Sequence, residues 1–247
     1  MRPFLFLREV TFAVAVMSAT VAPAQMFRSG PSAVPLVELF TSEGCSSCPP
    51  AEHWLGELRH DQGLWRDFVP VAWHVNYWDR LGWPDKFAAP AYTDRQYAYA
   101  QSWRSGRVYT PGFVRAGQEW TPREHGLSRS DDDDAPVGVL TAEVADGKVT
   151  VRFEIGNERT NLVAHVALLG GGIASDVRRG ENRGKQLEHE FLVLGWRSTP
   201  LRPGGEAHLT LPASAEDVAP VRQAVAIWIS RQGDPGPLQA TGGWLDK

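Results

Sequence analysis

The sequence predicts an α/β domain followed by an all-β, sandwich-like domain, and three observations carry this prediction. Two apolar runs, residues 34–41 and 68–75, flank a helical pattern, as in a βαβ unit with a parallel sheet. From Val137 onward apolar residues recur at every second position, which is typical of half-buried strands. Four consecutive aspartates at residues 131–134 lie between these parts. Such a run is more often a solvated linker than a calcium loop, so it indicates a domain boundary.

The length and charge of the chain limit its classes of partner. The 247 residues allow one large or two small domains, and the formal net charge is −4. Because no run of Lys or Arg occurs, we expect no nucleic acid partner.

The N-terminus has the features of a secretory signal peptide. Arg2 and Arg8 precede an apolar stretch over residues 11–21, and Ala22-Pro23-Ala24 offers a cleavage site. The apolar stretch is too short for a membrane anchor. We therefore expect a periplasmic or secreted protein with no membrane span once the signal is removed. The predicted organisation is a signal peptide (1–24), an α/β domain (25–130), an acidic linker (131–136) and a β-sandwich-like domain (137–247).

The elements of the first predicted domain follow from periodicity and start signals. Pro49 and Pro50 are tolerated near a first helical turn, so they predict a helix start there, with an apolar face at Ala51, Trp54, Leu55 and Leu58. Glu52 falls on the polar face of this predicted helix. Thr93 followed by Gln96 is a capping-box signal for a second helix ending near residue 105. A hairpin is expected over residues 113–120, with its turn at Gly117-Gln118.

The second predicted domain consists of short strands separated by turn signals. Asp146-Gly147 is a strong hairpin signal just before the alternating run Val149 to Ile155. Further strands are predicted over residues 162–169, 187–194, 207–211 and 221–229.

The two cysteines of the chain, Cys45 and Cys48, lie where the first strand leads into the first helix. A Cys-x-x-Cys in this position is typical of thioredoxin-like redox proteins. The helix N-terminus stabilises a thiolate, so Cys45 is the predicted nucleophile and Cys48 the resolving cysteine. The hydroxyls of Ser46 and Ser47 are predicted to tune the thiolate by hydrogen bonding.

Two other interpretations of the pair stay open. A static disulfide is one, and an exported protein can retain it. Metal capture by the pair, with His74 or His53, is the other. The chain has no second Cys-x-x-Cys and no pair of histidines with the spacing of a zinc finger, so a zinc site at the cysteines is not supported. After signal removal Met26 is the last methionine, so thioether ligands for copper are missing near the cysteines. We predict no metal and no cofactor.

Residues near the pair are predicted to bind a substrate. Both strands of a βαβ unit end at one edge of the sheet, so His74, Tyr77 and Trp78 should emerge near Cys45. Thioredoxin-like folds carry a cis-proline opposite the cysteines, and the order of elements assigns that place to Thr110-Pro111. An aromatic cluster between Tyr77 and Tyr109 packs an inserted helix or lines a groove for an unfolded peptide or apolar ligand.

These motifs resemble a family of secreted thioredoxin-like proteins known as domain of unknown function 1223. The resemblance implies a fold more than an activity, and it covers nearly the whole chain after the signal. The segment from Pro122 to Asp134, where such a fold often closes with a helix, looks unstructured. The segments that carry the resemblance are residues 37–42, 43–51, 74–79, 81–83, 108–111 and 179–184.

The leading functional prediction is therefore an exported thiol–disulfide oxidoreductase. Its partners would be a protein or small-molecule disulfide or thiol substrate and a membrane redox partner. The alternative is a non-catalytic two-domain binding module with a static disulfide, whose ligand lies on the aromatic cluster or near residues 179–183.

Overall fold

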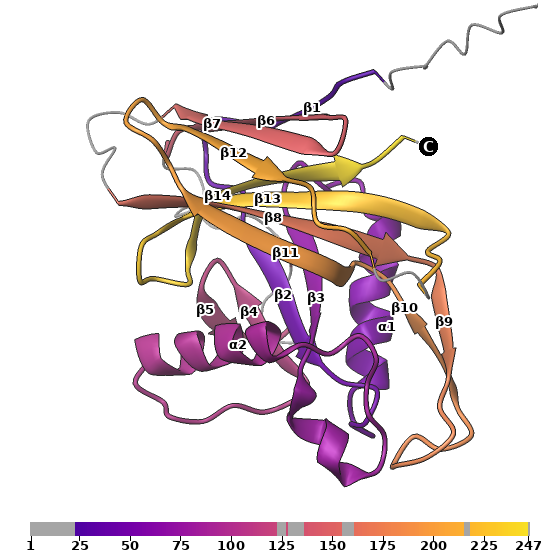
Figure 1. Cartoon of the computed structure of the whole chain (residues 1–247). Helices are drawn as coiled ribbons and strands as arrows, with labels where there is room; N and C mark the ends of the chain where they lie inside the picture. The colour runs from indigo at the N-terminus through magenta and orange to yellow at the C-terminus, as the bar shows by residue number, and fades with distance from the viewer. Residues whose placement is uncertain (1–22, 123–126, 128–135, 155–160, 215–217, 247) are drawn as a thin grey trace, which may run out of the picture.

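A large mixed β-sheet runs through the whole molecule in the computed structural model (Figure 1). The structure describes residues 23–122, 127, 136–154, 161–214 and 218–246. The eight strands of this sheet follow the order β14-β13-β8-β11-β3-β2-β4-β5. They are β2 (Leu36–Thr41), β3 (Val69–His74), β4 (Gly112–Arg115), β5 (Gln118–Trp120), β8 (Leu162–Gly171), β11 (Leu192–Pro200), β13 (Arg222–Arg231) and β14 (Pro237–Trp244).

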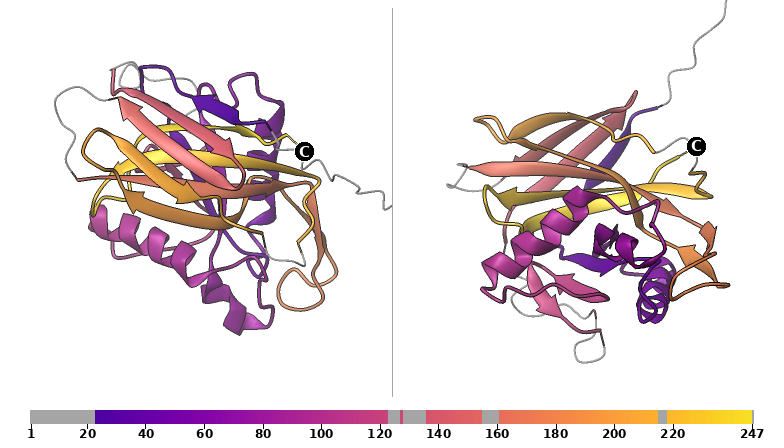
Figure 2. Two further views of the ribbon diagram at one scale, coloured as in Figure 1. Left: turned by 45° about the horizontal axis from the view of Figure 1, so that its top comes forward. Right: turned by 60° about the horizontal axis from the view of Figure 1, so that its bottom comes forward.

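A second, antiparallel sheet packs on one end of the large one, as Figure 2 shows from two further directions. Along β13, Val225, Ile227 and Ile229 pack with this second sheet, while the alternate residues join the central core. Because β13 is covered on both faces, its sequence is apolar at nearly every position. The strands of the second sheet are β1 (Gln25–Arg28), β6 (Val139–Ala145), β7 (Lys148–Glu154) and β12 (Glu206–Thr210).

The two α-helices cover opposite faces of the β2–β3 part of the sheet. In β2, Thr41 donates a hydrogen bond to Glu52 of α1 (Pro49–Glu57) at 2.6 Å. The preceding residue, Phe40, points the other way and meets the ring of Tyr99 in α2 (Pro90–Ser102). Successive side chains of a strand point to opposite faces, so this alternation fixes the side of each helix. Short 3-10 helices follow α1 (Leu58–His60) and β3 (Asn76–Leu81, η2).

The fold class predicted from the sequence is wrong. The structure is mostly β, and one sheet joins strands from both predicted domains instead of a thioredoxin-like domain followed by a separate sandwich. The junction is β11, which pairs in parallel with β3 and antiparallel with β8. The β2–β3–β4–β5 group leaves one edge of β3 unpaired, and β11 satisfies its backbone groups. The predicted linker lies almost wholly outside the described residues, so the boundary at 131–136 stays a prediction.

Several local predictions are confirmed and others are wrong in detail. The β2–α1–β3 unit is parallel, and the β6–β7 hairpin turns at Asp146-Gly147. The second helix begins at Pro90 rather than at Thr93, because proline is favoured in a first turn and the Thr93 hydroxyl bonds Asn76 instead. The β4–β5 turn is at Ala116-Gly117, one residue earlier than expected. The predicted strand 187–194 is divided between β10 (Gln186–His189) and β11.

A buried ion pair lies at the centre of the molecule. Arg95 of α2 makes two hydrogen bonds to Glu38 of β2, at 2.6 and 3.0 Å. Tyr99 and Trp73 also donate to that carboxylate. The guanidinium is enclosed by aromatic rings, and His165 stacks on Trp228 in the same layer. Burial, followed by the nearby Arg95 charge, lowers the pKa of His165 to about 3.

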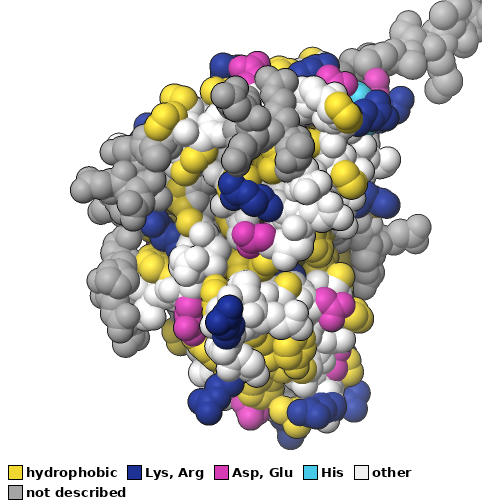
Figure 3. Space-filling model, turned by 90° about the vertical axis from the view of Figure 1, so that its left-hand side faces the viewer, with side chains coloured by type: hydrophobic (Ala, Val, Ile, Leu, Met, Phe, Trp, Pro, Cys, Tyr) yellow, Lys and Arg dark blue, Asp and Glu magenta, His cyan; other side chains and the backbone are white. Residues whose placement is uncertain are grey.

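The surface of the described residues is mixed. Hydrophobic side chains lie between Lys, Arg, Asp and Glu side chains on the face drawn in Figure 3. Within the described ranges, no helix is long and apolar enough to cross a membrane.

Candidate functional site

Cys45 and Cys48 form a disulfide in the turn between β2 and α1. Cys48 is the N-cap residue of α1, and Pro49 begins the helix. The Cys45 sulfur lies 3.4 Å from the hydroxyl of Ser47, one of the two serines predicted to tune a thiolate, and that tuning role stays a prediction. Both cysteines are 0% exposed. The pair therefore lies under other parts of the chain and not at an open edge of the sheet.

The loop of residues 177–185 packs against the cysteine turn. This loop joins β9 (Ile173–Asp176) to β10, and the hairpin lies beside α1 (Figure 1). The fully buried Asn182 side chain donates hydrogen bonds to the backbone oxygens of Glu43 and Cys45, at 2.9 and 2.8 Å. Its neighbour Glu181 accepts a hydrogen bond from the Ser46 amide at 3.1 Å. The segment 179–184, part of which the alternative prediction assigned to ligand binding, thus holds the cysteine turn in place.

The 3-10 helix η2 closes a second side of the cysteine turn. A Cβ on Gly44 would lie 3.1 Å from the Cβ of Trp78, so the turn and η2 are in close contact. Trp83 follows η2 and donates a hydrogen bond to Glu43 at 2.7 Å. Gly180 of the 177–185 loop has φ +74 and would place a Cβ 3.0 Å from Trp83. This close approach and positive φ favour glycine there.

An aromatic groove of about 480 Å³ lies beside the disulfide. The rings of Trp54, Phe113 and Trp120 meet there, with centroids between 5.3 and 6.0 Å apart. Polar groups on its walls are few and include the hydroxyls of Ser47 and Thr121. The wall residues are Ser47, Pro50, Ala51, Trp54, Tyr109, Pro111, Phe113, Trp120, Thr121 and Pro122. A larger depression, of about 680 Å³, lies between α2 and the turns near Gly117 and Gly236, and glycine and polar residues dominate its walls.

The predicted substrate residues are divided between the groove and the interior. The Thr110–Pro111 peptide bond is cis, and Pro111 lines the groove. Trp78 donates a hydrogen bond to the Thr110 hydroxyl at 2.7 Å, so both side chains already have a partner. Tyr77 donates to Gln96 at 3.2 Å. His74 is 1% exposed and lies inside the molecule, away from any surface where a substrate would bind.

Beneath the cysteine turn, His189 lies between two carboxylates. Its Nδ1 is 2.7 Å from Glu52 and its Nε2 is 3.1 Å from Glu43, and all three side chains are buried. Burial alone lowers the pKa of His189, but the charge of Glu52 and the hydrogen bond to Glu43 outweigh it and raise the pKa to about 10. Burial raises the pKa of both carboxyls, yet His189 holds them below their usual range. The three groups form a buried charged triad.

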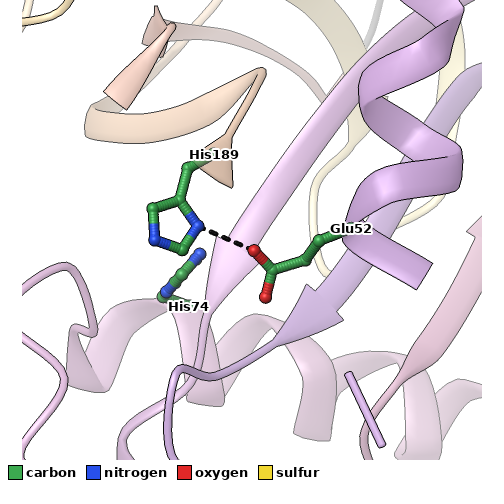
Figure 4. A group of neighbouring side chains, drawn as sticks. All are labelled: Glu52, His74 and His189. Carbon is green, nitrogen blue, oxygen red and sulfur yellow. Dashed lines mark hydrogen bonds and ion pairs between the residues drawn. The ribbon is translucent and has the colours of Figure 1, made fainter. Parts of the chain in front are cut away.

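His74 and Asp85 form a second buried pair next to this triad. The His74 Nδ1 is 2.7 Å from an Asp85 oxygen, and the same carboxylate accepts the Glu43 amide. Burial raises the pKa of Asp85, but His74 and the backbone N–H groups hold it below its usual range. Figure 4 shows the other ring nitrogen of His74 pointing toward Glu52 and His189.

The sequence prediction missed this cluster. It placed Glu52 on the polar face of the helix, whereas Glu52 is buried against β2 and β10. Glu43, Asp85, Asn182 and His189 were not selected at all. A signal was present for Glu43, which stands two residues before Cys45. The others lie far apart in the sequence, and only tertiary contacts bring them together. His53 is exposed on α1, whereas its neighbour Glu52 is buried against β2 and β10.

Comparisons with known proteins agree with this architecture. Residues 36–230 match the sequence model of the family described as "Protein of unknown function (DUF1223)". The chain belongs to this family. No curated protein matches the chain.

Two solved structures are similar to the chain over most of its length. Protein AGR_C_4864 from Agrobacterium tumefaciens is 26% identical, with a TM-score of 0.59 over 88% of this chain and 96% of that chain. HBP35 of Porphyromonas gingivalis is 14% identical, with a TM-score of 0.57 over 89% and 77% of the two chains. At that identity the second likeness concerns the fold alone.

Proposed function

We propose that this chain is an exported, non-catalytic binding protein. In this proposal the Cys45–Cys48 disulfide is a static cross-link, and the aromatic groove beside it holds an extended apolar segment of a partner polypeptide. The observation that carries the proposal is the complete burial of both cysteines in a turn that the 177–185 loop holds in place, next to a groove lined by aromatic rings.

The burial of the disulfide favours a static role. A cysteine that exchanges disulfides must meet an attacking sulfur, so reactive pairs are partly exposed. Here both cysteines are 0% exposed, and two buried hydrogen bonds hold the 177–185 loop against their turn. Closing a loop of four residues stabilises the fold by only about 2 kcal/mol in the chain-entropy model. The cross-link therefore acts mainly on local shape: it fixes the turn that carries Glu43 and Ser47.

The form of the groove favours an extended peptide. Among the described strands β5 pairs with β4 alone, so one row of its backbone groups is available for pairing. An extended segment that adds to such an edge gains main-chain hydrogen bonds and places alternate side chains into neighbouring pockets. Trp120 belongs to β5 and lines the groove, so a pocket for apolar side chains lies next to that edge.

Binding of a permanently unfolded polypeptide tests the groove. The probe is a fluorescently labelled, reduced and carboxymethylated protein, and the measurement is fluorescence anisotropy. We expect Trp54→Ala combined with Trp120→Ala to weaken binding at least 30-fold, because truncating an anchoring tryptophan costs about 2 kcal/mol or more. Tyr97→Ala is the control, since Tyr97 is exposed on α2 and lies outside the groove. Equal affinity for all three proteins would refute the groove as the binding site.

Thiol–disulfide exchange is the second candidate function. The 3.4 Å contact between the Cys45 sulfur and the Ser47 hydroxyl favours it, because Ser47 also lines the groove and a substrate there would lie close to the pair. The test is catalysed reduction of insulin by dithiothreitol. A static disulfide predicts the same rate for the wild type and for Cys45→Ser combined with Cys48→Ser. Turnover that only the wild type shows would replace the static interpretation by this one.

A further inference from the structure

We propose that Glu52, His74 and His189 form a binding site for a divalent transition-metal ion, with Zn²⁺ as the best match. This site uses neither cysteine and is independent of the groove. One donor atom from each residue lies within 4.8 Å of the others, and the three side chains converge in Figure 4. They come from α1, the end of β3 and β10, so a bound ion would tie three elements together.

The first argument is an unpartnered nitrogen. In the described structure the Nε2 atom of His74 is shielded from solvent and has no hydrogen-bond partner, although His74 is 1% exposed. Its Nδ1 is held by Asp85, so Nε2 is the atom that points toward Glu52 and His189. A buried acceptor without a partner is costly, and nearly all such groups are satisfied in native proteins. A cation at the point where the donors converge would satisfy it.

The second argument is the arrangement around the histidines. Metal-ligating histidines almost always donate their other ring N–H to a carboxylate or carbonyl, which orients the ring. Both histidines here have such a carboxylate: Asp85 lies 2.7 Å from Nδ1 of His74, and Glu43 lies 3.1 Å from Nε2 of His189. The atoms left over, Nε2 of His74 and Nδ1 of His189, are those directed at Glu52.

The third argument is charge. Glu43, Glu52 and Asp85 bring three carboxyl groups into the interior. Within the described residues their hydrogen-bond and ion-pair partners are the two imidazoles, Thr41, Ser175, Trp83 and backbone N–H groups, and no Lys or Arg is among them. Burying more carboxylates than cationic partners costs free energy, and coordination of a metal ion is one way to offset that cost.

The donor set selects the metal. Two imidazole nitrogens with one carboxylate oxygen suit Zn²⁺, which binds them at about 2.0–2.2 Å and prefers four ligands. Hard ions such as Ca²⁺ and Mg²⁺ prefer oxygen donors alone. The ring of Phe87 packs edge-on against both imidazoles, with centroids 5.6 and 5.2 Å away, and forms an apolar wall around the site. In this site the ion would take the place of the proton between His189 and Glu52.

Zinc binding by the mature chain with its disulfide intact tests the site. Because the cluster is buried, the protein is refolded from urea with Zn²⁺ or with a chelator, freed of excess metal, and assayed by elemental analysis. We expect one zinc per chain in the wild type, and at least a tenfold weaker affinity in Glu52→Gln and His74→Gln. Asp85→Asn should lower the affinity 10- to 100-fold, as removal of such an orienting partner typically does. His53→Ala is the control and should bind as the wild type does.

Cobalt as a spectroscopic probe separates this site from capture by the cysteines. Co²⁺ in a site of two nitrogens and one oxygen gives visible d–d bands without a thiolate charge-transfer band, and the disulfide should stay intact. The circular dichroism of each variant shows whether it has folded. Folded wild-type protein without stoichiometric zinc, or zinc retained equally by folded Glu52→Gln and His74→Gln, would overturn the proposal. A thiolate band in the cobalt spectrum would do the same.

Discussion

The Asn182 side chain should control how fast the disulfide is reduced. It is fully buried and donates to the backbone oxygens of Glu43 and Cys45. In Asn182→Ala both hydrogen bonds are lost, and the 177–185 loop should open more often. We expect a reductant to reach the sulfurs when this loop is open, so the reduction rate should follow the population of the open state.

The size of the effect can be worked out from the two bonds. Each hydrogen bond contributes about 0.5–1.5 kcal/mol net, so the closed loop should lose about 1–3 kcal/mol. At 1.4 kcal/mol for each factor of ten in an equilibrium constant, the open population and the reduction rate should rise about 5- to 150-fold.

The assay is reduction by dithiothreitol under native conditions, with the thiols trapped by alkylation and counted by mass spectrometry. Gln186→Ala is the matched control, because Gln186 belongs to the same hairpin but makes an exposed hydrogen bond to Asp176. We expect the control to be reduced within a factor of two of the wild-type rate. Low urea concentrations should not change the rate of Asn182→Ala if opening is local. If Asn182→Ala is reduced as slowly as the control, the loop does not protect the disulfide and the reasoning fails.

Two further predictions concern stability. Glu38→Gln leaves Arg95 buried without its charged partner, so urea unfolding should show a loss of about 3–5 kcal/mol, against at most about 1 kcal/mol for Glu206→Gln in an exposed pair. Equal losses would contradict a central role for the buried pair, and adding Arg95→Met to Glu38→Gln should recover much of the loss. His165 has a pKa of about 3 in the folded protein and about 6.5 in the unfolded chain. Its contribution to the free energy of unfolding is therefore fully present above pH 6.5 and is lost as the pH falls toward 3. Between pH 7 and 4.5 the free energy of unfolding of the wild type should fall by about 3 kcal/mol more than that of His165→Gln. If the two proteins lose stability with pH in parallel, His165 is not buried in its neutral form.

Local features of the sequence predicted local features of the structure. The near-continuous apolar runs predicted β2 and β3, and the prolines after Cys48 predicted the start of α1, because these signals depend on backbone sterics and on the burial of neighbouring residues. The capping-box signal at Thr93 was misleading because a tertiary partner, Asn76, took the hydroxyl. The strands β1 and β14 carry weaker patterns and were missed.

Glu52 was assigned to the wrong environment because local sequence signals do not show which tertiary partners cover a helix. Periodicity on α1 predicts which residues share a face, but not which faces are buried. Glu52 lies next to the apolar face, and β10 covers it with His189, a residue 137 positions away. From the helix sequence alone a charged side chain is predicted to be exposed, because its burial is tolerated only when a partner of opposite charge is buried with it.

The sequence by itself determined the parallel β2–α1–β3 unit, the place of the two cysteines at the start of α1, the β6–β7 hairpin and membership of a family. Each depends on residues that are close in the chain, where backbone geometry and apolar period act directly. The tertiary structure alone decided that β11 joins β3, which merges the two predicted domains into one sheet. It also decided that Asn182 bonds to the cysteine turn and that Glu52, His74 and His189 meet. These contacts arise because an unpaired strand edge and buried polar groups must find partners, and nothing in the local sequence specifies how far away those partners lie.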